Sequence, residues 1–246
     1  MKTITNHNIK IDKPTAITIG KFDGLHRGHM SLIDELKNVA AQNNLATAVL
    51  TFAPHPIAFF TKTHMPLILD PGEKAELFQE LGIDFYIQYK FDKNFADTLP
   101  EDFLEKILYG QLNAKMLVAS ADYRFGKGGA GDVYFAQKVG DKIGLKVHII
   151  PDLLTHRHEK ISSNLLRQLV VEKNFGLIDQ LCNRPFSIRG FVDKKGTITP
   201  HPDKILPPAG DYEVIVENHG KTVVTVKNGT IKVGIKHGEN VVLSFI

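Results

Sequence analysis

Residues 20–29 read Gly-Lys-Phe-Asp-Gly-Leu-His-Arg-Gly-His, between a β-rich apolar run at Thr15–Ile19 and a stretch of helical periodicity that begins near Met30. In an open α/β sheet, ligands bind where a strand ends and a helix begins. Glycines allow the backbone to approach a ligand closely, and the following helix offers unpaired amide hydrogens and a positive dipole end. His26 and His29 are three residues apart, so both can face a phosphate group. The stretch predicts a phosphate-binding loop in an α/β domain.

This loop is neither of the two common nucleotide-binding loops. It lacks the Gly-Lys-Ser/Thr ending of the Walker loop and the Gly-x-Gly-x-x-Gly spacing of the dinucleotide fingerprint. The alternative interpretation is that His26 and His29 are ordinary loop and capping residues. The coincidence of motif, strand and helix favours phosphate binding.

Outward from the loop, the chain up to about Ile150 alternates short β-rich runs with longer helical stretches. Strands are predicted at 15–19, 47–52, 85–88, 116–119 and 146–150, and helices at about 30–40, after Pro71-Gly72, at 100–109 and at 132–143. Such alternation is typical of a parallel sheet with crossover helices. The second strand should end at Pro54-His55-Pro56, because proline cannot continue a central strand. The predicted fold class is Rossmann-like α/β.

The alternation of strand-like and helix-like stretches ends after about residue 152. A charged stretch at Thr155–Lys160 predicts a loop, with His156 and His158 solvated. Ser162 is expected to cap a helix that ends near Val171, and a second short helix precedes Cys182. Beyond Pro185, β-rich runs are predicted at 186–192, 212–216, 222–226, 231–235 and 241–245. Turn signals such as Asn228-Gly229 separate them, which indicates a small all-β, barrel-like domain.

Composition limits the class of protein. The chain has 246 residues, 43% of them hydrophobic and 23% charged, which is typical of a soluble globular protein. Its net charge of +3 is too small and too scattered to indicate nucleic-acid binding. A single cysteine, Cys182, excludes an internal disulfide, and no Cys/His spacing resembles a zinc site. A polar N-terminus without a signal segment and the lack of a long apolar run predict a cytoplasmic protein that does not enter a membrane.

The order strand, His-x-Gly-His, helix resembles the nucleotidylyltransferase superfamily, whose members transfer an AMP or CMP unit onto a phosphate or carboxylate. The longer string at 20–29 is similar to that of the prokaryotic FAD synthetases, which usually combine an FMN adenylyltransferase domain with a riboflavin kinase domain. Further matching motifs follow in the expected order: Thr51-Phe-Ala-Pro-His-Pro56, Ala121-Asp-Tyr-Arg-Phe-Gly126, Ile161-Ser-Ser-Asn-Leu-Leu-Arg167 and Arg184-Pro-Phe186. The resemblance covers roughly residues 14–192.

The resemblance implies a specific role for each of these motifs. It implies an adenylyltransferase domain at 1–183 and a reduced, riboflavin kinase-like barrel at 184–246. The implied catalytic residues are His26 and His29. The implied ATP-binding residues are Gly20, Lys21, Phe22, Asp23, Gly28, Ser162, Ser163 and Arg167, and the implied flavin-binding residues are Phe52, His55, Pro56, Asp122, Tyr123, Arg124 and Phe125. For Asp23, a role in fixing the loop is the alternative to a role in fixing the nucleotide. Mg²⁺ is expected to arrive with ATP rather than on protein ligands, with FMN as substrate and FAD as product.

Each motif also has a purely structural interpretation. Pro54-His55-Pro56 can be a rigid turn, and residues 122–125 a packed loop. Ser162 and its neighbours can be a plain helix cap. The glycine-rich run at 127–131 can close over a ligand or be an ordinary loop.

Several residues depart from the family pattern. Asn164 stands where the family commonly has threonine, and Ala119-Ser120-Ala121 stands where a glycine precedes the acidic pair. In the barrel, the Pro-Thr-Ala-Asn motif of the kinase has no counterpart in Lys194–Asp203, and the sequence ends at Ile246. These departures predict that riboflavin kinase activity is absent.

On this interpretation, an FMN phosphate oxygen attacks the α-phosphorus of ATP in line with departing pyrophosphate, and no protein nucleophile is needed. Two alternatives remain. One is an enzyme of the same superfamily with another acceptor, such as a phosphorylated sugar, a lipid precursor or pantetheine. The other is a flavin-binding regulator that has lost turnover.

Overall fold

The computed structural model describes residues 1–5, 10–151, 155–156, 159–235 and 237–246. The chain forms two compact units. Unit 1 comprises Met1–Phe22, Gly28–Met65 and Pro71–Lys160, and unit 2 comprises Asp23–Arg27, Pro66–Asp70 and Ile161–Ile246.

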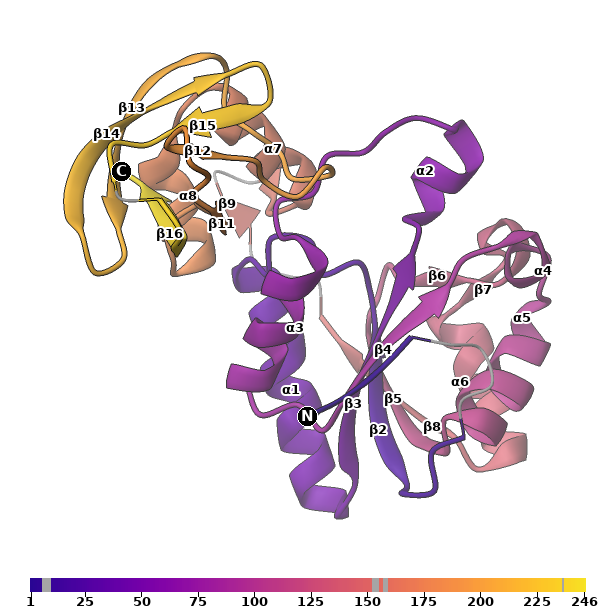
Figure 1. Ribbon diagram of the computed structural model, residues 1–246. Coiled ribbons are helices and arrows are strands. Elements are labelled where there is room, and N and C mark those ends of the chain that lie inside the picture. The colour runs from indigo at the N-terminus through magenta and orange to yellow at the C-terminus, as the bar shows by residue number, and fades with distance from the viewer. Residues whose placement is uncertain (6–9, 152–154, 157–158, 236) are drawn as a thin grey trace. The chain divides into compact units, whose positions relative to one another are not determined.

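Unit 1 is built on a six-stranded parallel sheet with the strand order β1-β4-β3-β2-β5-β8. Its strands are β1 (Lys2–Ile4), β2 (Thr15–Ile19), β3 (Ala46–Ala53), β4 (Phe85–Lys90), β5 (Ala114–Ser120) and β8 (Lys146–Ile150). Helices α1 (Arg27–Asn43) and α3 (Pro71–Glu80) lie on one side of the sheet, and α6 (Val133–Ile143) lies on the other (Figure 1). The predicted Rossmann-like α/β fold is confirmed.

The central strands are buried on both faces, as a parallel sheet covered by helices requires. All five residues of β2 are buried, and Ile17 and Leu117 belong to the main apolar core of this unit. The same burial explains why the near-continuous apolar run of β2 was found with its correct bounds; β8, an edge strand in which only Ile150 is buried, was also found with its bounds.

The rest of unit 1 consists of short elements at the carboxyl ends of the strands. These are α2 (Pro56–Thr61), α4 (Lys93–Ala96), α5 (Pro100–Asp102), η1 (Phe103–Gln111), β6 (Arg124–Phe125), η2 (Lys127–Gly129), β7 (Gly131–Asp132), β9 (Thr155–His156) and β10 (Glu159–Lys160). The predicted helix at 100–109 is present, and it is mostly a π-helix, because α5 passes directly into η1. Its last turn closes with the amide of Leu112 donating to the carbonyl of Ile107, five residues back. Apolar spacing does not distinguish this widened turn from an α-helix.

Two predicted loops contain or adjoin short paired strands. The glycine-rich run connects β6 to β7, which pair with each other, and a β-carbon at the preceding Gly126 would lie 2.8 Å from the backbone of Pro100. Whether the run at 127–131 closes over a ligand stays a prediction. The charged stretch contains the antiparallel pair β9 and β10. The expectation for His158 lies outside the described residues, and that for His156 concerns a side chain that is not described.

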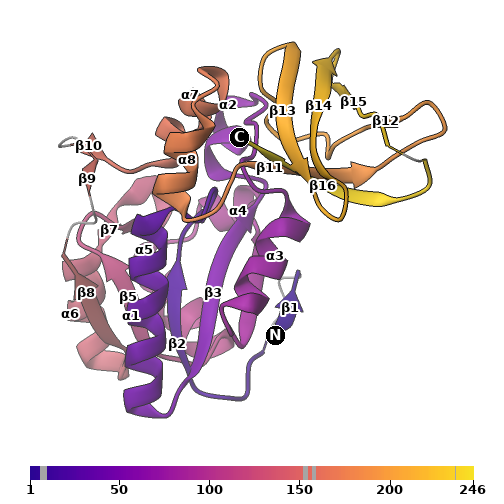
Figure 2. The same cartoon turned by 90° about the vertical axis from the view of Figure 1, so that its left-hand side faces the viewer.

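Unit 2 combines two helices, α7 (Ser163–Val171) and α8 (Phe175–Cys182), with a six-stranded antiparallel sheet (Figure 2). The sheet has the order β11-β16-β13-β14-β15-β12, and a bridge between Val192 and Ile198 brings its two edge strands together. Its strands are β11 (Ser187–Phe191), β12 (Thr197–Ile198), β13 (Gly210–Val216), β14 (Gly220–Lys227), β15 (Thr230–Lys232) and β16 (Asn240–Phe245). The small barrel-like β domain is therefore confirmed.

Local signals in unit 2 acted as predicted. Ser162 caps α7 by accepting the amide hydrogen of Leu165 at 3.2 Å. Asn228 and Gly229 both have positive φ at the β14–β15 turn, as a tight hairpin demands. Helices α7 and α8 share one apolar core with the β-strands. The predicted boundary at 183/184 thus falls inside a single compact unit, and a functional boundary there stays a prediction.

Cys182 is buried and free, and burial raises the pKa of its thiol to about 11. None of the helices in the described part of the chain combines the length and apolarity that would span a membrane. Within the same residues, no cluster of three or more His, Cys, Asp or Glu side chains could hold a metal ion.

Candidate nucleotide- and flavin-binding site

The predicted phosphate loop connects β2 to α1 and has a strained backbone. Phe22 and Leu25 have φ of 49° and 39°, a region that side chains other than glycine rarely adopt, and both side chains are fully buried. Burial of two large apolar groups offsets the cost of this conformation. The sequence therefore holds residues 22–25 in one fixed shape, although only one of these four residues is a glycine.

The two candidate catalytic histidines flank the start of α1. His26 is the residue before the helix and is almost completely buried. His29 lies in the first turn, half-buried, and its ring packs against that of Phe22 with centroids 5.2 Å apart. The first turn of a 17-residue helix has unpaired backbone amides, which attract an anion. The sequence placed His29 in the loop before a helix that begins near Met30, whereas α1 begins at Arg27 and includes His29. Its contact with phosphate stays a prediction.

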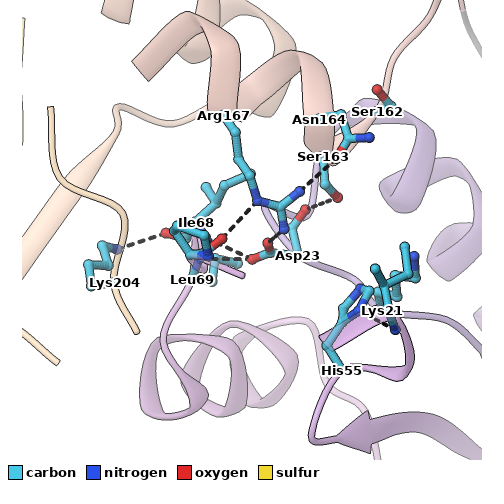
Figure 3. Close-up of polar contacts among 12 residues, drawn as sticks. Lys21, Asp23, His55, Ile68, Leu69, Ser162, Ser163, Asn164, Arg167 and Lys204 are labelled. Atoms are coloured by element: carbon cyan, nitrogen blue, oxygen red, sulfur yellow. Dashed lines mark hydrogen bonds and ion pairs between the residues drawn. The ribbon is translucent and has the colours of Figure 1, made fainter. Parts of the chain in front are cut away.

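Asp23 has a different environment from the one expected of an ATP ligand. Its carboxylate is 1% exposed and accepts hydrogen bonds from the amides of Ile68 and Leu69 at 2.9 and 3.1 Å. It also forms an ion pair with the guanidinium of Arg167, and its backbone carbonyl accepts the hydroxyl of Ser163 at 2.7 Å (Figure 3). We call Asp23 a junction, because these contacts link the loop to Ile68 and Leu69 and to helix α7.

Arg167 is likewise engaged with the protein. Besides Asp23, it donates from Nε to the carbonyl of Pro66 at 2.7 Å and from Nη1 to the side chain of Asn164 at 3.0 Å. Its side chain is 15% exposed. Within the structure, Ser162, Ser163 and Arg167 serve the helix cap and the loop, and their contact with ATP stays a prediction.

Two more residues hold the segment Asp23–Arg27. The guanidinium of Arg184 donates to the carbonyls of Gly24 and Leu25, and Nε of Arg27 donates to the side chain of Asn183 at 3.1 Å. Arg184 and Asn183 follow α8 directly. Arg184-Pro-Phe186 was recognised only as a motif that matches the family, and no local pattern reveals this contact across 160 positions.

The remaining loop residues differ in exposure. Lys21 is exposed, and its carbonyl accepts Nζ of the buried Lys74 at 3.1 Å. Gly20 is half-buried; a β-carbon there would lie 3.1 Å from the Phe22 ring. Gly28 is buried within the first turn of α1. The absent side chain at Gly20 makes room for Phe22, which explains that glycine by packing as well as by ligand approach.

The first predicted flavin motif lies at the end of β3. The strand stops at Ala53, as the prolines predict, and Pro56 begins α2. His55 caps this helix by accepting the amide hydrogen of Ile57 at Nδ1, at 3.1 Å. His55 therefore has a structural role at the start of α2, and its contact with a flavin stays a prediction.

The second predicted flavin motif follows β5. Asp122 accepts the hydroxyl of Ser120 at 2.7 Å, and the exposed Arg124 pairs with Asp132 at 3.0 Å. The rings of Tyr123 and Phe125 stack at 5.6 Å, and burial raises the pKa of the Tyr123 phenol. Asp122 and Arg124 are thus the polar rim of an aromatic pair.

A continuous set of aromatic rings joins the two flavin motifs. Phe52 contacts Phe95 at 5.3 Å, Phe95 contacts Phe103 at 5.9 Å, and Phe103 contacts Phe125 at 5.6 Å. We call the set the aromatic cluster; its members are Phe52, Phe59, Phe60, Phe91, Phe95, Phe103, Tyr89, Tyr123 and Phe125. All belong to unit 1 and come from the carboxyl ends of β3, β4 and β5 or from the helices that follow. Phe60 is 63% exposed, and contact of a large apolar side chain with water is unfavourable.

A pocket of about 240 Å³ opens beside the aromatic cluster. It is lined by Tyr89, Asp92, Asn94, Phe95, Thr98 and Ile107. Burial and the nearby carboxylate of Asp92 raise the pKa of the Tyr89 phenol, which stays a neutral hydrogen-bond donor and acceptor at physiological pH. Its lining combines the rings of Tyr89 and Phe95 and the apolar Ile107 with the polar side chains of Asp92, Asn94 and Thr98, a mixture that suits a planar ring system with polar edges. The sequence motifs did not predict the residues that line this pocket, because Tyr89 and Phe95 lie outside the quoted motifs.

Fold and site together define a Rossmann-like α/β protein with a His-x-Gly-His loop and a small β-barrel-like domain. The family of FAD synthetases matches residues 8–165. A bifunctional riboflavin kinase/FMN adenylyltransferase from Listeria monocytogenes is 34% identical over 240 residues, which cover 90% of this chain and 76% of the relative. The protein described under the same name from Bacillus subtilis is 31% identical and covers 96% of this chain and 78% of the relative. The chain belongs to the FAD synthetase family.

Other relatives match this chain over a smaller share of their own length. The relative from Buchnera aphidicola subsp. Schizaphis graminum, with the same description, is 34% identical over 188 residues, and the match spans 60% of its length. With the relative from Escherichia coli K12, at 33% identity, the match spans 56% of its length. A crystal structure of a macrolide-efflux protein from Streptococcus pneumoniae covers 100% of this chain and 89% of its own, with a TM-score of 0.87 at 24% identity. That structure shares the fold.

Proposed function

We propose that this protein is an FMN adenylyltransferase that converts ATP and FMN to FAD and pyrophosphate. The observation that carries the proposal is the arrangement of one sheet edge: the carboxyl end of β2 leads to the helix end at His29, and the carboxyl ends of β3, β4 and β5 bear the aromatic cluster. An anion-binding helix end and an aromatic pocket on the same edge suit a substrate that has both a phosphate and a flavin ring. The family membership supports the same activity.

In the proposed reaction, a phosphate oxygen of FMN attacks the α-phosphorus of ATP, the bond to the β-phosphate oxygen breaks, and pyrophosphate leaves. His26, His29 and the amides of the first turn of α1 stabilise the charge that spreads over the phosphates. Gly20, Lys21, Phe22, Asp23, Gly28, Ser162, Ser163 and Arg167 remain assigned to the ATP side. ATP is expected to enter as its magnesium complex, so the ion is part of the substrate.

On the flavin side, Phe52, His55, Pro56, Asp122, Tyr123, Arg124 and Phe125 remain the proposed contacts. To them we add Tyr89 and Phe95, which line the pocket beside the cluster. Phe95 contacts Phe52 and Tyr89 at 5.3 and 4.9 Å and so joins the first flavin motif to the pocket wall.

Replacement of Phe95 by leucine should therefore weaken flavin binding. Leucine keeps an apolar side chain but removes the ring face, so the KM for FMN is expected to rise about tenfold while the KM for ATP stays within about twofold. Steady-state kinetics with each substrate varied in turn measure both. Phe191→Leu, at an exposed position of the other unit, is the matched control. An unchanged KM for FMN would remove Phe95 from the flavin site.

We also propose that riboflavin kinase activity is absent. Phosphoryl transfer requires metal and phosphates held in line with the attacking hydroxyl, and Lys194–Asp203 lacks the Pro-Thr-Ala-Asn motif that serves this purpose in the family. The polar residues here make local turns instead: Asp193 accepts the amide hydrogens of Lys195 and Thr197, and His201 accepts that of Asp203 at 3.2 Å.

Incubation with riboflavin and MgATP, followed by chromatography, should accordingly yield no FMN above the background of heat-inactivated protein. The positive control is FAD formation from FMN by the same preparation. Formation of FMN at a rate comparable with that of FAD would assign a kinase role to Thr199, His201 or Asp203.

The choice of acceptor is tested with a panel of phosphorylated compounds. Pyrophosphate release is measured with FMN, a sugar phosphate, glycerol phosphate and phosphopantetheine, each with MgATP. Release with FMN alone is expected. Faster release with another acceptor would leave the superfamily chemistry intact and replace the substrate. No release with any acceptor, together with tight binding of FMN, would favour the flavin-binding regulator.

A further inference from the structure

We propose that the β-rich part of unit 2 supports catalysis indirectly, because it fixes the segment Pro66–Asp70 against Asp23. Lys204 and Arg189 are the positioning residues, and they act on the segment Asp23–Arg27, which carries His26. The inference rests on the proposed function for its catalytic consequence. Its structural basis lies entirely within unit 2, which includes Asp23–Arg27 and Pro66–Asp70.

The segment Pro66–Asp70 is joined to the β-rich part by backbone pairing. Leu67 forms a parallel bridge with Lys204. The amide of Leu67 donates to the carbonyl of Asp203 at 2.6 Å, and the amide of Ile205 donates to the carbonyl of Leu67 at 2.8 Å. Although 66–70 lies between α2 and α3 in sequence, its hydrogen bonds make it a short addition to the β-rich part.

Two charged side chains reinforce this pairing. Lys204 is 6% exposed; its Nζ donates to the carbonyl of Ile68 at 2.8 Å and lies 5.4 Å from the ring centre of Phe186. Arg189 donates to the carboxylate of Asp70 through Nη2 at 3.2 Å and Nε at 3.4 Å. Burial of an ammonium group is costly unless it has specific partners. An apolar residue would cost less at position 204, so a requirement to fix Ile68 is the simplest reason for a lysine.

The opposite side of the same peptide groups holds Asp23. While the carbonyl of Ile68 accepts from Lys204, its amide and that of Leu69 donate to Asp23 Oδ1. The ammonium, the peptide and the carboxylate thus form one unbroken series of polar contacts (Figure 3). Asp23 begins the segment Asp23–Arg27, in which Gly24 has no room for a side chain, since a β-carbon would lie 2.5 Å from Leu166.

This series has a mechanical consequence. Loss of Lys204 removes the donor that holds the carbonyl of Ile68. We expect the amides of Ile68 and Leu69 to shift, and with them Asp23 and, three residues later, His26. Misplacement of a catalytic group by about 1 Å can reduce a rate about a hundredfold without loss of the fold. The β-rich part then has a function in adenylyl transfer even without a kinase site.

The test compares Lys204→Met with Lys204→Arg and with Lys221→Met. Methionine keeps the length of the side chain but removes the charge, arginine keeps the charge, and Lys221 is an exposed lysine of β14 that pairs with Glu213. For Lys204→Met we expect kcat for FAD formation to fall about ten- to a hundredfold with the KM for FMN within about twofold. Partial recovery is expected for Lys204→Arg, and no change for Lys221→Met. Equal kcat in Lys204→Met and the parent protein overturns the inference.

Amide hydrogen exchange provides a readout that does not depend on activity. In Lys204→Met, exchange should accelerate both in 66–70 and in 23–27, whereas a purely local structural role would accelerate it in 66–70 alone and so overturn the inference. If the parent protein makes no FAD, the proposed function fails, and the exchange pattern by itself still decides whether 66–70 positions Asp23. Should Lys204→Met not fold, Arg189→Leu replaces it with the same expected pattern.

Discussion

Replacement of His29 by alanine is expected to reduce the rate of FAD formation about a hundred- to a thousandfold, the typical effect of removing one donor that meets transition-state charge. His29 lies in the first turn of α1, half-buried beside Phe22, so its loss removes little apolar packing. The KM values for FMN and ATP should change far less than kcat, because the charge on the phosphates develops fully only in the transition state.

The measurement is steady-state kinetics, with circular dichroism and thermal unfolding to confirm an intact fold. His219→Asn is the control, because His219 is a histidine of unit 2 whose ring faces Glu239 at 3.0 Å and which has no proposed role in catalysis. Similar kcat in His29→Ala and the parent protein would exclude His29 from the reaction.

Replacement of Asp23 by alanine is expected to lower the free energy of unfolding by about 3 kcal/mol, because it leaves the nearly buried guanidinium of Arg167 without its carboxylate and two buried amides without their acceptor. Arg167→Ala should cost less, since Asp23 keeps both amides. The double variant should lose less free energy of unfolding than the sum of the two single variants. Each single variant already removes the ion pair, so the sum counts its loss twice.

Urea unfolding of the three variants and the parent protein measures this cycle. The matched control is the exposed pair of Lys221 and Glu213, for which a coupling of less than about 0.5 kcal/mol is expected. Strict additivity of Asp23→Ala and Arg167→Ala would mean that the ion pair contributes nothing, and the description of Asp23 as a junction would be wrong.

The fold was predictable from sequence where a local pattern of residues decides the structure. Thr15–Ile19 and Lys146–Ile150 were predicted with their observed bounds, and the Ser162 cap and the Asn228-Gly229 turn follow from local chemistry alone. The π-helix at Phe103–Gln111 was not predictable, because its apolar spacing fits an α-helix equally well. Local patterns report local structure, and they succeed where tertiary contacts do not alter it.

The candidate site was predictable in its motifs but not in its connections. The sequence named Phe52 and Phe125 as flavin contacts, yet only the fold brings Phe95 between them. For Asp23 the sequence left a role in the loop or at the nucleotide open, and its loop contacts with Ile68 and Arg167, 45 and 144 positions away, appear only in the fold. Contacts over such distances depend on how strands and helices are ordered in space, which periodicity does not encode.

The central claim, adenylyl transfer from ATP to FMN, is tested most directly with FMN whose phosphate oxygens carry ¹⁸O. The labelled FMN is incubated with MgATP and the protein, and FAD and pyrophosphate are separated and weighed by mass spectrometry. Attack by the FMN phosphate on the α-phosphorus predicts FAD and pyrophosphate in equal amounts, with the label retained in FAD and none in pyrophosphate. Absence of FAD, or label in the pyrophosphate, would contradict the account.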